Sequence, residues 1–448
     1  MSLRASLLRE LENPSLSVDR RAELSCETAK AFENSGEYDR ACKVLRDYWR
    51  RIGEDPKLDG LEPSTAAELL LRAGVLTGII GCQRQIPNAQ ETAKDLITQS
   101  HSIFESRQMI KKIAEARTEL ALCYWRTNEL SEARACLQEA LTLLTYDNEL
   151  KAKAILRTAI VEHAAEHDHK AFRILEKHSP LFLKLNNHTL RGSYHITLAD
   201  RLVNVGESRR QTDYIDRALI EYAAASYHFD KAEHRPYLAN VETNLGYLYF
   251  KINRFDEANE HLNRARRIYT SIRDSRLAAQ VDETRARILL SQGHTSDAER
   301  VIRSAVRVQE KAGNSFLLAE ALITYGKVLA RSERYVASLA QFRRAIELSD
   351  NAGLEHRAAE AALTAFREIA EHLLASEQGK LLSGLGLGQD RLSRERDLIK
   401  LALERSKGKI SPAARSLGVS WQWLGYALNH KHKDLLKYRT PVRRRPRK

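Results

Sequence analysis

The stretch Leu245–Ala265, LGYLYFKINRFDEANEHLNRA, decides the fold. Gly246 and Tyr249 stand three residues apart, a polar turn follows, and small and apolar residues then recur at Ala258, Leu262 and Ala265. Spacings of three and four place side chains on one face of a helix. Because Gly and Ala let a partner helix approach closely, the stretch predicts two antiparallel helices packed against each other.

The same pattern recurs along most of the chain. The positions equivalent to Ala258 are Ala298 and Ser338, each 40 residues further on. Earlier copies centre on Ala41 and Ala133, and weaker ones lie near Ala93, Ala171 and Ala218. One helix pair cannot bury its own apolar face, so the pattern predicts an all-α solenoid of about eight stacked pairs. The alternative is an antiparallel helical bundle without true repeats, and the strict 40-residue register favours repeats.

These residues resemble the tetratricopeptide repeat (TPR) over most of residues 22–350. The period exceeds the family's usual ~34 residues, which we interpret as longer helices and loops. The resemblance implies that partners bind to the first helix of each repeat, on the concave face. Matching by register predicts a partner groove that would suit a protein or a peptide with an acidic end, unless these positions are ordinary solvated ones. The predicted groove residues are Asn240, Asn244, Tyr247, Lys251, Arg287, Lys327 and Arg331.

Three segments are expected. Residues 1–376 would form the array, closed by an amphipathic capping helix over Arg357–Ala375. Residues 377–390 contain Gly384-Leu-Gly386-Leu-Gly388, which follows a helix instead of a strand and therefore predicts a flexible linker, not a phosphate-binding loop. Residues 391–448 would form a separate small module.

The net charge of the chain lies in that last segment. Residues 391–448 carry 17 Lys and Arg against 4 Asp and Glu, a net charge of +13, whereas residues 1–390 carry 55 groups of each sign. A neutral body with one strongly basic end indicates a polyanionic partner for that end, nucleic acid first and an anionic membrane surface second.

The spacing of helix signals in the basic segment predicts three short helices. The first spans about Arg394–Ser406 and ends at Gly408. Ser411 would cap the second, Pro412–Leu417, with proline at its first position and Gly418 closing it. Ser420 would cap the third, from Trp421 to about His430. The expected core of this module is Ile410, Leu417, Val419, Leu424 and Leu428.

The run from Gly408 to Leu424, GKISPAARSLGVSWQWL, is similar to the Fis-type helix-turn-helix. The resemblance implies that the helix from Trp421 onward enters the major groove of duplex DNA. The chain departs from the family in having Gly425, Tyr426 and Ala427 where basic residues are common. The base-contact candidates are Gln422, Trp423 and Tyr426. The phosphate-contact candidates are Lys409, Ser411, Arg415, Ser420, Lys431, Lys433, Arg443, Arg444 and Arg445.

Other chemistry is not expected. The five cysteines lack CxxC spacing, which predicts reduced, buried thiols. The sequence contains no run of about 18 uncharged apolar residues, so no membrane span is predicted. His163-Ala-Ala-Glu166-His167 matches the H-x-x-E-H zinc motif, but its register places it at a solvated helix end. We therefore expect no metal, no cofactor and no enzymatic activity.

The sequence favours a bacterial-type cytoplasmic transcription regulator, in which the array senses or recruits a partner and is a candidate for homodimerisation. The alternative is a TPR scaffold whose basic end docks RNA, an anionic membrane or an acidic partner. A scaffold tail needs basic residues but not three short helices with their own start and stop signals. The turn from Ser411 to Ser420 therefore separates the two hypotheses.

Overall fold

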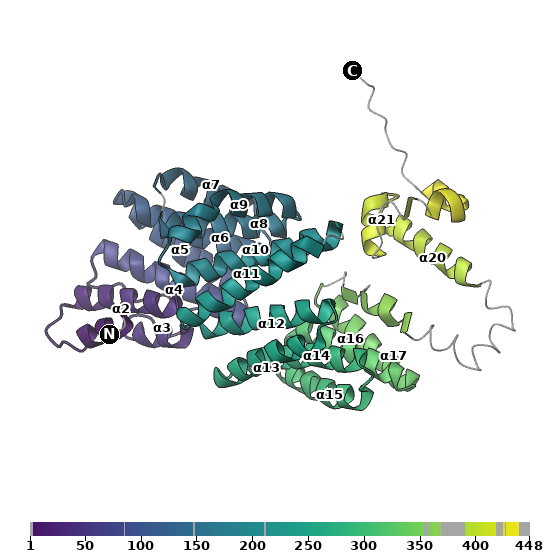
Figure 1. Cartoon of the computed structure of the whole chain (residues 1–448). Coiled ribbons are helices and arrows are strands. Elements are labelled where there is room, and N and C mark those ends of the chain that lie inside the picture. The colour runs from purple at the N-terminus through teal and green to yellow at the C-terminus, as the bar shows by residue number, and fades with distance from the viewer. Residues whose placement is uncertain are drawn as a thin grey trace, which may run out of the picture. The chain divides into compact units, whose positions relative to one another are not determined.

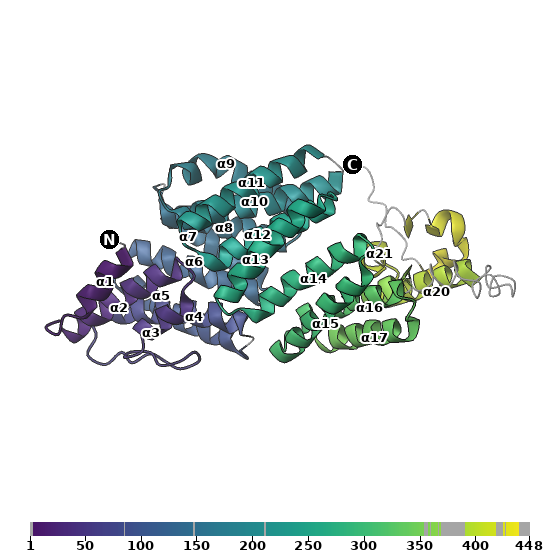
Figure 2. The same ribbon diagram turned by 60° about the horizontal axis from the view of Figure 1, so that its bottom comes forward.

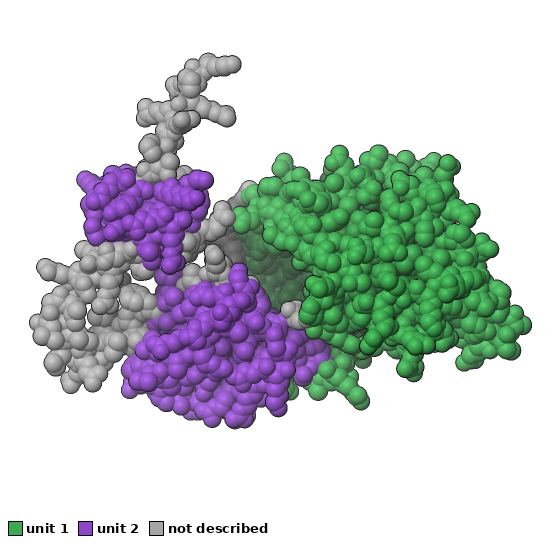
Figure 3. Space-filling view, turned by 180° about the vertical axis from the view of Figure 1, so that it is seen from behind, with its two compact units in different colours: residues 1–273 green, residues 274–448 purple. Residues whose placement is uncertain are grey.

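The computed structural model describes residues 3–84, 86–146, 148–209, 212–353, 357–358, 360–365, 367–368, 390–417, 424–425 and 427–438. Within these ranges every regular element is a helix, so the chain has the all-α fold that its sequence predicted. Contacts divide it into two compact units, residues 1–273 and 274–448, which Figure 3 colours separately.

The array consists of helices that pack in sequential pairs (Figures 1 and 2). Helix α1 (Leu3–Leu11) precedes the first pair. The eight pairs in the described ranges are α2 (Val18–Glu33) with α3 (Tyr38–Val44), α4 (Pro63–Gln83) with α5 (Ala89–Ser106), α6 (Ile110–Arg126) with α7 (Leu130–Leu143), α8 (Glu149–Ala164) with α9 (Asp168–Lys184), α10 (His188–Arg209) with α11 (Thr212–Lys231), α12 (Arg235–Lys251) with α13 (Phe255–Ser271), α14 (Ser275–Ser291) with α15 (Thr295–Ala312), and α16 (Ser315–Arg331) with α17 (Tyr335–Asn351). The first unit contains α1 to α13 and the second begins with α14.

Small residues determine how closely the helices of a pair approach. A Cβ atom added at Gly246 would lie 2.5 Å from Cγ of Leu262, and one added at Gly326 would lie 2.8 Å from the ring of Phe342. At the position equivalent to Ala258, Ser338 is fully buried and its hydroxyl donates to the carbonyl of Gly326 at 2.8 Å. The spacing that predicted the pairs therefore marks their closest contacts.

Two of the turns within pairs show how the short connection is made, since one residue of each adopts the left-handed conformation. Between α12 and α13 this residue is Asn253 (φ 61°), and between α16 and α17 it is Glu333 (φ 59°). In the first case the amide of Arg254 donates back to the carbonyl of Tyr249 at 2.9 Å, which satisfies a carbonyl at the helix end.

The first unit curves until its N-terminal part touches the fifth pair and the turn that precedes the sixth. Arg4 of α1 forms an ion pair with Glu233, just before α12, at 2.7 Å. The hydroxyl of Thr189 in α10 donates to the carbonyl of Asn34 at 2.8 Å. Side chains on the inner side of this curve can therefore meet across more than one pair.

Helix α4 is the one described helix that is long and apolar enough to cross a membrane by length and composition. Most of its apolar window, 83%, is buried inside the protein. This degree of burial is typical of a core helix in a packed domain.

The capping helix is present in the part of Arg357–Ala375 that the structure describes. Residues 357–358, 360–365 and 367–368 are helical, and Ala361 and Ala365 join the core that contains Phe342. Arg357 pairs with Glu320 of α16 at 2.9 Å. The end of the predicted capping helix and almost all of the predicted linker, residues 377–390, lie outside the described residues.

Candidate nucleic-acid interface and partner groove

The C-terminal module begins with two helices joined by a tight turn. Helix α20 spans Asp390–Arg405, and Gly408 follows with φ 75°, its amide donating to the carbonyl of Leu403 at 2.8 Å. The prediction that Gly408 ends the first helix is confirmed. The predicted start of that helix was four residues too late.

The second helix, α21, spans Ile410–Ser416, so the predicted start at Pro412 with Ser411 as its cap is wrong. The carbonyl of Lys409 accepts the first helical hydrogen bond, from Ala413 at 3.1 Å. Proline fits here equally well, because any of the first amides of a helix lacks a partner within it. Ser411 is therefore an exposed residue of the first turn.

A small apolar core holds the module together. Leu424 and Leu428 are fully buried as predicted, and Ile410 and Leu417 pack against the core at partial exposure. The predicted core residue Val419 lies outside the described residues. Ala413 and Ala414, small residues that allow a tight helix crossing, are also buried in this core, and the expected set did not include the following members: Ile399, Ala402, Leu403, Ala427 and Leu435.

Leu435 belongs to a further element that the sequence analysis did not predict. A single π-helical turn, η1 (Ala427–Lys431), leads into a 3-10 helix, η2 (Lys433–Tyr438). Arg396 of α20 pairs with Asp434 at 2.8 Å, and Lys400 lies 5.5 Å from the ring centre of Tyr438. The spacing of seven residues between Leu428 and Leu435 is the sequence signal that could have predicted this element.

Among the predicted phosphate contacts, Lys409, Ser411 and Lys433 are exposed. Arg415 lies in α21 and Lys431 in η1, but their side chains are outside the description. The other predicted phosphate contacts, Ser420, Arg443, Arg444 and Arg445, and all three predicted base contacts, Gln422, Trp423 and Tyr426, lie outside the described residues. They remain predictions.

In the first unit, the predicted groove residues lie on α12. Asn240 is exposed, whereas the amide of Asn244 donates to Asp200 of α10 at 3.4 Å. Tyr222 of α11 donates to the same carboxyl at 2.5 Å, and burial raises the pKa of Asp200 to about 6. Asn244 therefore helps to connect three helices. Lys251 lies 5.4 Å from the ring centre of Tyr247.

In the second unit, the predicted groove residues face charged neighbours. Arg287 lies 4.0 Å from Glu283 on α14, and Arg331 pairs with Glu368 at 3.2 Å. Burial and the charge of Arg287 lower the pKa of Lys327. Arg287 and Arg331 are thus partly compensated by carboxylates of the protein itself, whereas Lys327 lies near another cation.

The sequence analysis missed a cluster of charged side chains on the first helices of pairs one to four. We call it the inner cluster. It consists of Lys30, Glu33, Glu68, Arg72, Lys112, Glu115, Glu119, Lys153 and Arg157. The available signal was the recurrence of charge at positions four apart on successive first helices, as in Glu115 and Glu119.

Arg72 is the centre of the inner cluster. Its side chain is 1% exposed, and its guanidinium binds Glu33 at 2.7 Å and Glu115 at 2.8 Å. Burial alone would raise the pKa of Glu115, but the charges of Arg72, Lys30 and Lys112 hold it well below its ordinary value. Burial raises the pKa of Glu33 to about 7 despite the opposing charge of Arg72.

The H-x-x-E-H sequence lies where its register predicted, between the end of α8 and the start of α9. The ring of His163 bonds to Asp168 at 2.7 Å, and that of His167 bonds to Glu162 at 2.8 Å. The two imidazoles thus engage different carboxylates. The described part of the chain contains no group of three or more His, Cys, Asp or Glu residues that could hold a metal ion.

The cysteines are free thiols, but the prediction that all are buried is wrong. Cys26, Cys123 and Cys136 are buried, Cys42 is half-buried, and Cys82 is exposed near the end of α4.

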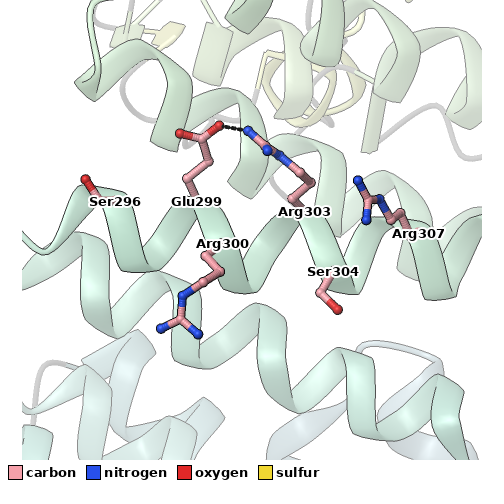
Figure 4. Close-up of a pocket in the computed structure, with 6 residues that line it drawn as sticks. All are labelled: Ser296, Glu299, Arg300, Arg303, Ser304 and Arg307. Carbon is pink, nitrogen blue, oxygen red and sulfur yellow. Dashed lines mark hydrogen bonds and ion pairs between the residues drawn. The ribbon is translucent and has the colours of Figure 1, made fainter.

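A shallow pocket runs along α15 (Figure 4). Glu299 binds Arg303 and Arg334, and Figure 4 shows Arg300 turned away from Glu299. Arg300 pairs instead with Asp297 at 2.9 Å. These carboxylates neutralise much of the positive charge. The pocket is lined by Ser296, Glu299, Arg300, Arg303, Ser304 and Arg307.

Two family models match parts of the chain. Residues 393–430 match the bacterial regulatory protein, Fis family, and residues 114–143 match the tetratricopeptide repeat. No curated protein sequence matches the chain.

Solved structures resemble the array at low sequence identity. The apo form of the quorum sensor NprR from B. thuringiensis is 12% identical, with a TM-score of 0.53 over 77% of this chain and 92% of that one. The human IFIT1 dimer with PPP-AAAA is 14% identical, with a TM-score of 0.51 over 77% and 76%. These likenesses show a common helical-repeat fold. The chain therefore combines a TPR-like array with a Fis-type helix-turn-helix, as its sequence predicted.

Proposed function

We propose that the chain is a cytoplasmic, non-enzymatic transcription regulator that binds duplex DNA through residues 391–448. The observation that carries this proposal is the coincidence of the Fis-family match at residues 393–430 with the segment that holds the net charge of +13. Phosphates would be neutralised by Lys409, Lys433 and the basic tail, and the helix from Trp421 would read base edges.

The array is proposed to bind a protein or peptide partner on the first helices of its repeats. Support comes from the helical-repeat fold, in which stacked pairs create extended concave surfaces. The partner would regulate the DNA-bound chain or be recruited by it. A homodimer formed through the array is part of the same proposal.

An electrophoretic mobility shift with the full chain and the DNA upstream of its own gene tests the proposal. We expect a shifted band that survives excess random competitor and weakens steeply between about 50 and 200 mM salt, because each phosphate contact releases counterions. A band abolished equally by random DNA would favour a non-specific anchor. No shift at low salt would refute DNA binding.

A further inference from the structure

Helix α11 presents an apolar face to solvent. Ile220 and Tyr227 are 68% and 57% exposed, with Ala223 and Ala224 between them. Steps of three, four and seven residues place these four side chains on one side of the helix. The helix packs against α10 and α12 through its other residues, so this side is left uncovered (Figure 1). We call the four residues the α11 face.

The repeat register shows that this face departs from the repeats that follow it. Ala218 lies 40 residues before Ala258, as Ala258 lies 40 before Ala298, and all three are fully buried. Positions on the second helices can therefore be compared directly. The residues that correspond to Ile220, Ala223 and Tyr227 are Glu260, Asn263 and Arg267 in α13 and Arg300, Arg303 and Arg307 in α15. A surface that is polar in two repeats and apolar in α11 indicates a contact that belongs to the fifth pair.

The α11 face is self-complementary about its centre. A two-fold axis perpendicular to the helix, opposite the midpoint between Ala223 and Ala224, generates a second, antiparallel copy of α11. Ile220 and Tyr227 are equally far from that midpoint, so each lies opposite the other residue of the second copy. The two alanines at the centre allow the helices to approach closely.

The charged residues at the ends of the face match in the same arrangement. Asp216 and Lys231 are both exposed and equally far from the midpoint, so each lies on the side of its opposite charge in the second copy. The ammonium group of Lys231 lies 5.7 Å from the ring centre of Tyr227, at the edge of the face. Opposite charges at the two ends favour a copy of the same face over an anionic membrane or a nucleic acid, which present one sign of charge only.

We propose that the α11 face is the homodimer interface of the protein, formed by two antiparallel copies of α11. This inference rests on the homodimer that the proposed function includes, and it names the surface. Such a dimer carries two helix-turn-helix modules, which suits a DNA site with two half-sites.

Sedimentation equilibrium of the full chain measures the dissociation constant of the dimer. We expect wild type to dimerise at micromolar concentration. Ile220→Glu, with the residue of the equivalent position in α13, should raise the dissociation constant at least about a hundredfold, because a two-fold interface buries the new carboxylate twice. Val336→Glu is the matched control, since Val336 is 86% exposed on α17, and it should leave the dimer unchanged. Circular dichroism verifies that each variant is folded.

A charge exchange tests the pairing between copies. Asp216→Lys and Lys231→Asp should each raise the dissociation constant about tenfold, because each replaces two attractive pairs with two repulsive ones. The double variant Asp216→Lys/Lys231→Asp restores opposite charges and should return the dissociation constant to within about threefold of wild type. A double variant as weak as the single ones would refute the antiparallel arrangement.

A monomeric wild-type chain, or a dimer that Ile220→Glu leaves intact, would overturn the inference. Binding of a monomeric chain to phospholipid vesicles, lost in Ile220→Glu, would assign the α11 face to a membrane instead. A monomer that still shifts duplex DNA would leave the proposed DNA binding intact.

Discussion

Arg72→Met is expected to destabilise the first unit strongly. Methionine fills similar space but leaves Glu33 and Glu115 buried without their shared cation. Removing one partner from a buried, hydrogen-bonded ion pair costs about 3–5 kcal/mol. Lys30 and Lys112 still face Glu115, which places the expected loss toward the lower end of that range. The matched control is Arg84→Met, because Arg84 pairs with Asp39 at 2.6 Å while both side chains are 58% or more exposed, and its loss should be under about 1 kcal/mol.

The loss should depend on pH in a defined direction. Without Arg72, the pKa of Glu33 and that of Glu115 both rise in the folded state. When the pKa of a carboxyl group is higher in the folded protein than in the unfolded chain, the folded protein loses stability as the pH increases through the folded-state pKa. Since the pKa of Glu33 is already about 7, the difference between wild type and Arg72→Met should widen from pH 5 to pH 8.

Urea denaturation at pH 5, 6.5 and 8 measures this effect. Circular dichroism reports the helices, and tryptophan fluorescence includes Trp49, which is buried in the same core as α4. A variant as stable as wild type at pH 8, or a loss that shrinks as the pH rises, would refute the argument that Arg72 neutralises buried carboxylates.

Three further outcomes are expected. Gln422→Ala and Tyr426→Ala should each reduce discrimination between a preferred site and random DNA by about 1–3 kcal/mol in competition binding. If the folded variants discriminate as well as wild type, the helix does not enter the major groove. Lys433→Ala should lower affinity for all sequences and reduce the salt slope by about one, so a loss at one sequence alone would contradict a phosphate contact. Phe342→Ala should cost about 3–5 kcal/mol of unfolding free energy, because its buried ring fills the space beside Gly326, and a loss below about 1 kcal/mol would contradict that packing.

Much of the fold could be predicted from the sequence because its determinants are local. Gly246 and Ala258 are twelve residues apart and meet in one helix pair, so spacing alone identifies the contact. Gly408 ends α20 through its own left-handed backbone, which only neighbouring residues influence. The start of α21 was misplaced by two residues because proline is tolerated anywhere in the first turn of a helix.

The sequence by itself determined the helix pairs, their stacking and the basic helix-turn-helix, since these depend on residues within one repeat or its neighbour. Only the tertiary structure decided which charged side chains meet. Lys30 and Glu115 are 85 residues apart and come together because small rotations between successive pairs add up to a curve. The sequence pattern specifies each pair, but it does not specify the sum of those rotations. For the same reason, Asn244, predicted as a partner contact, was found bonded to Asp200 on the preceding repeat.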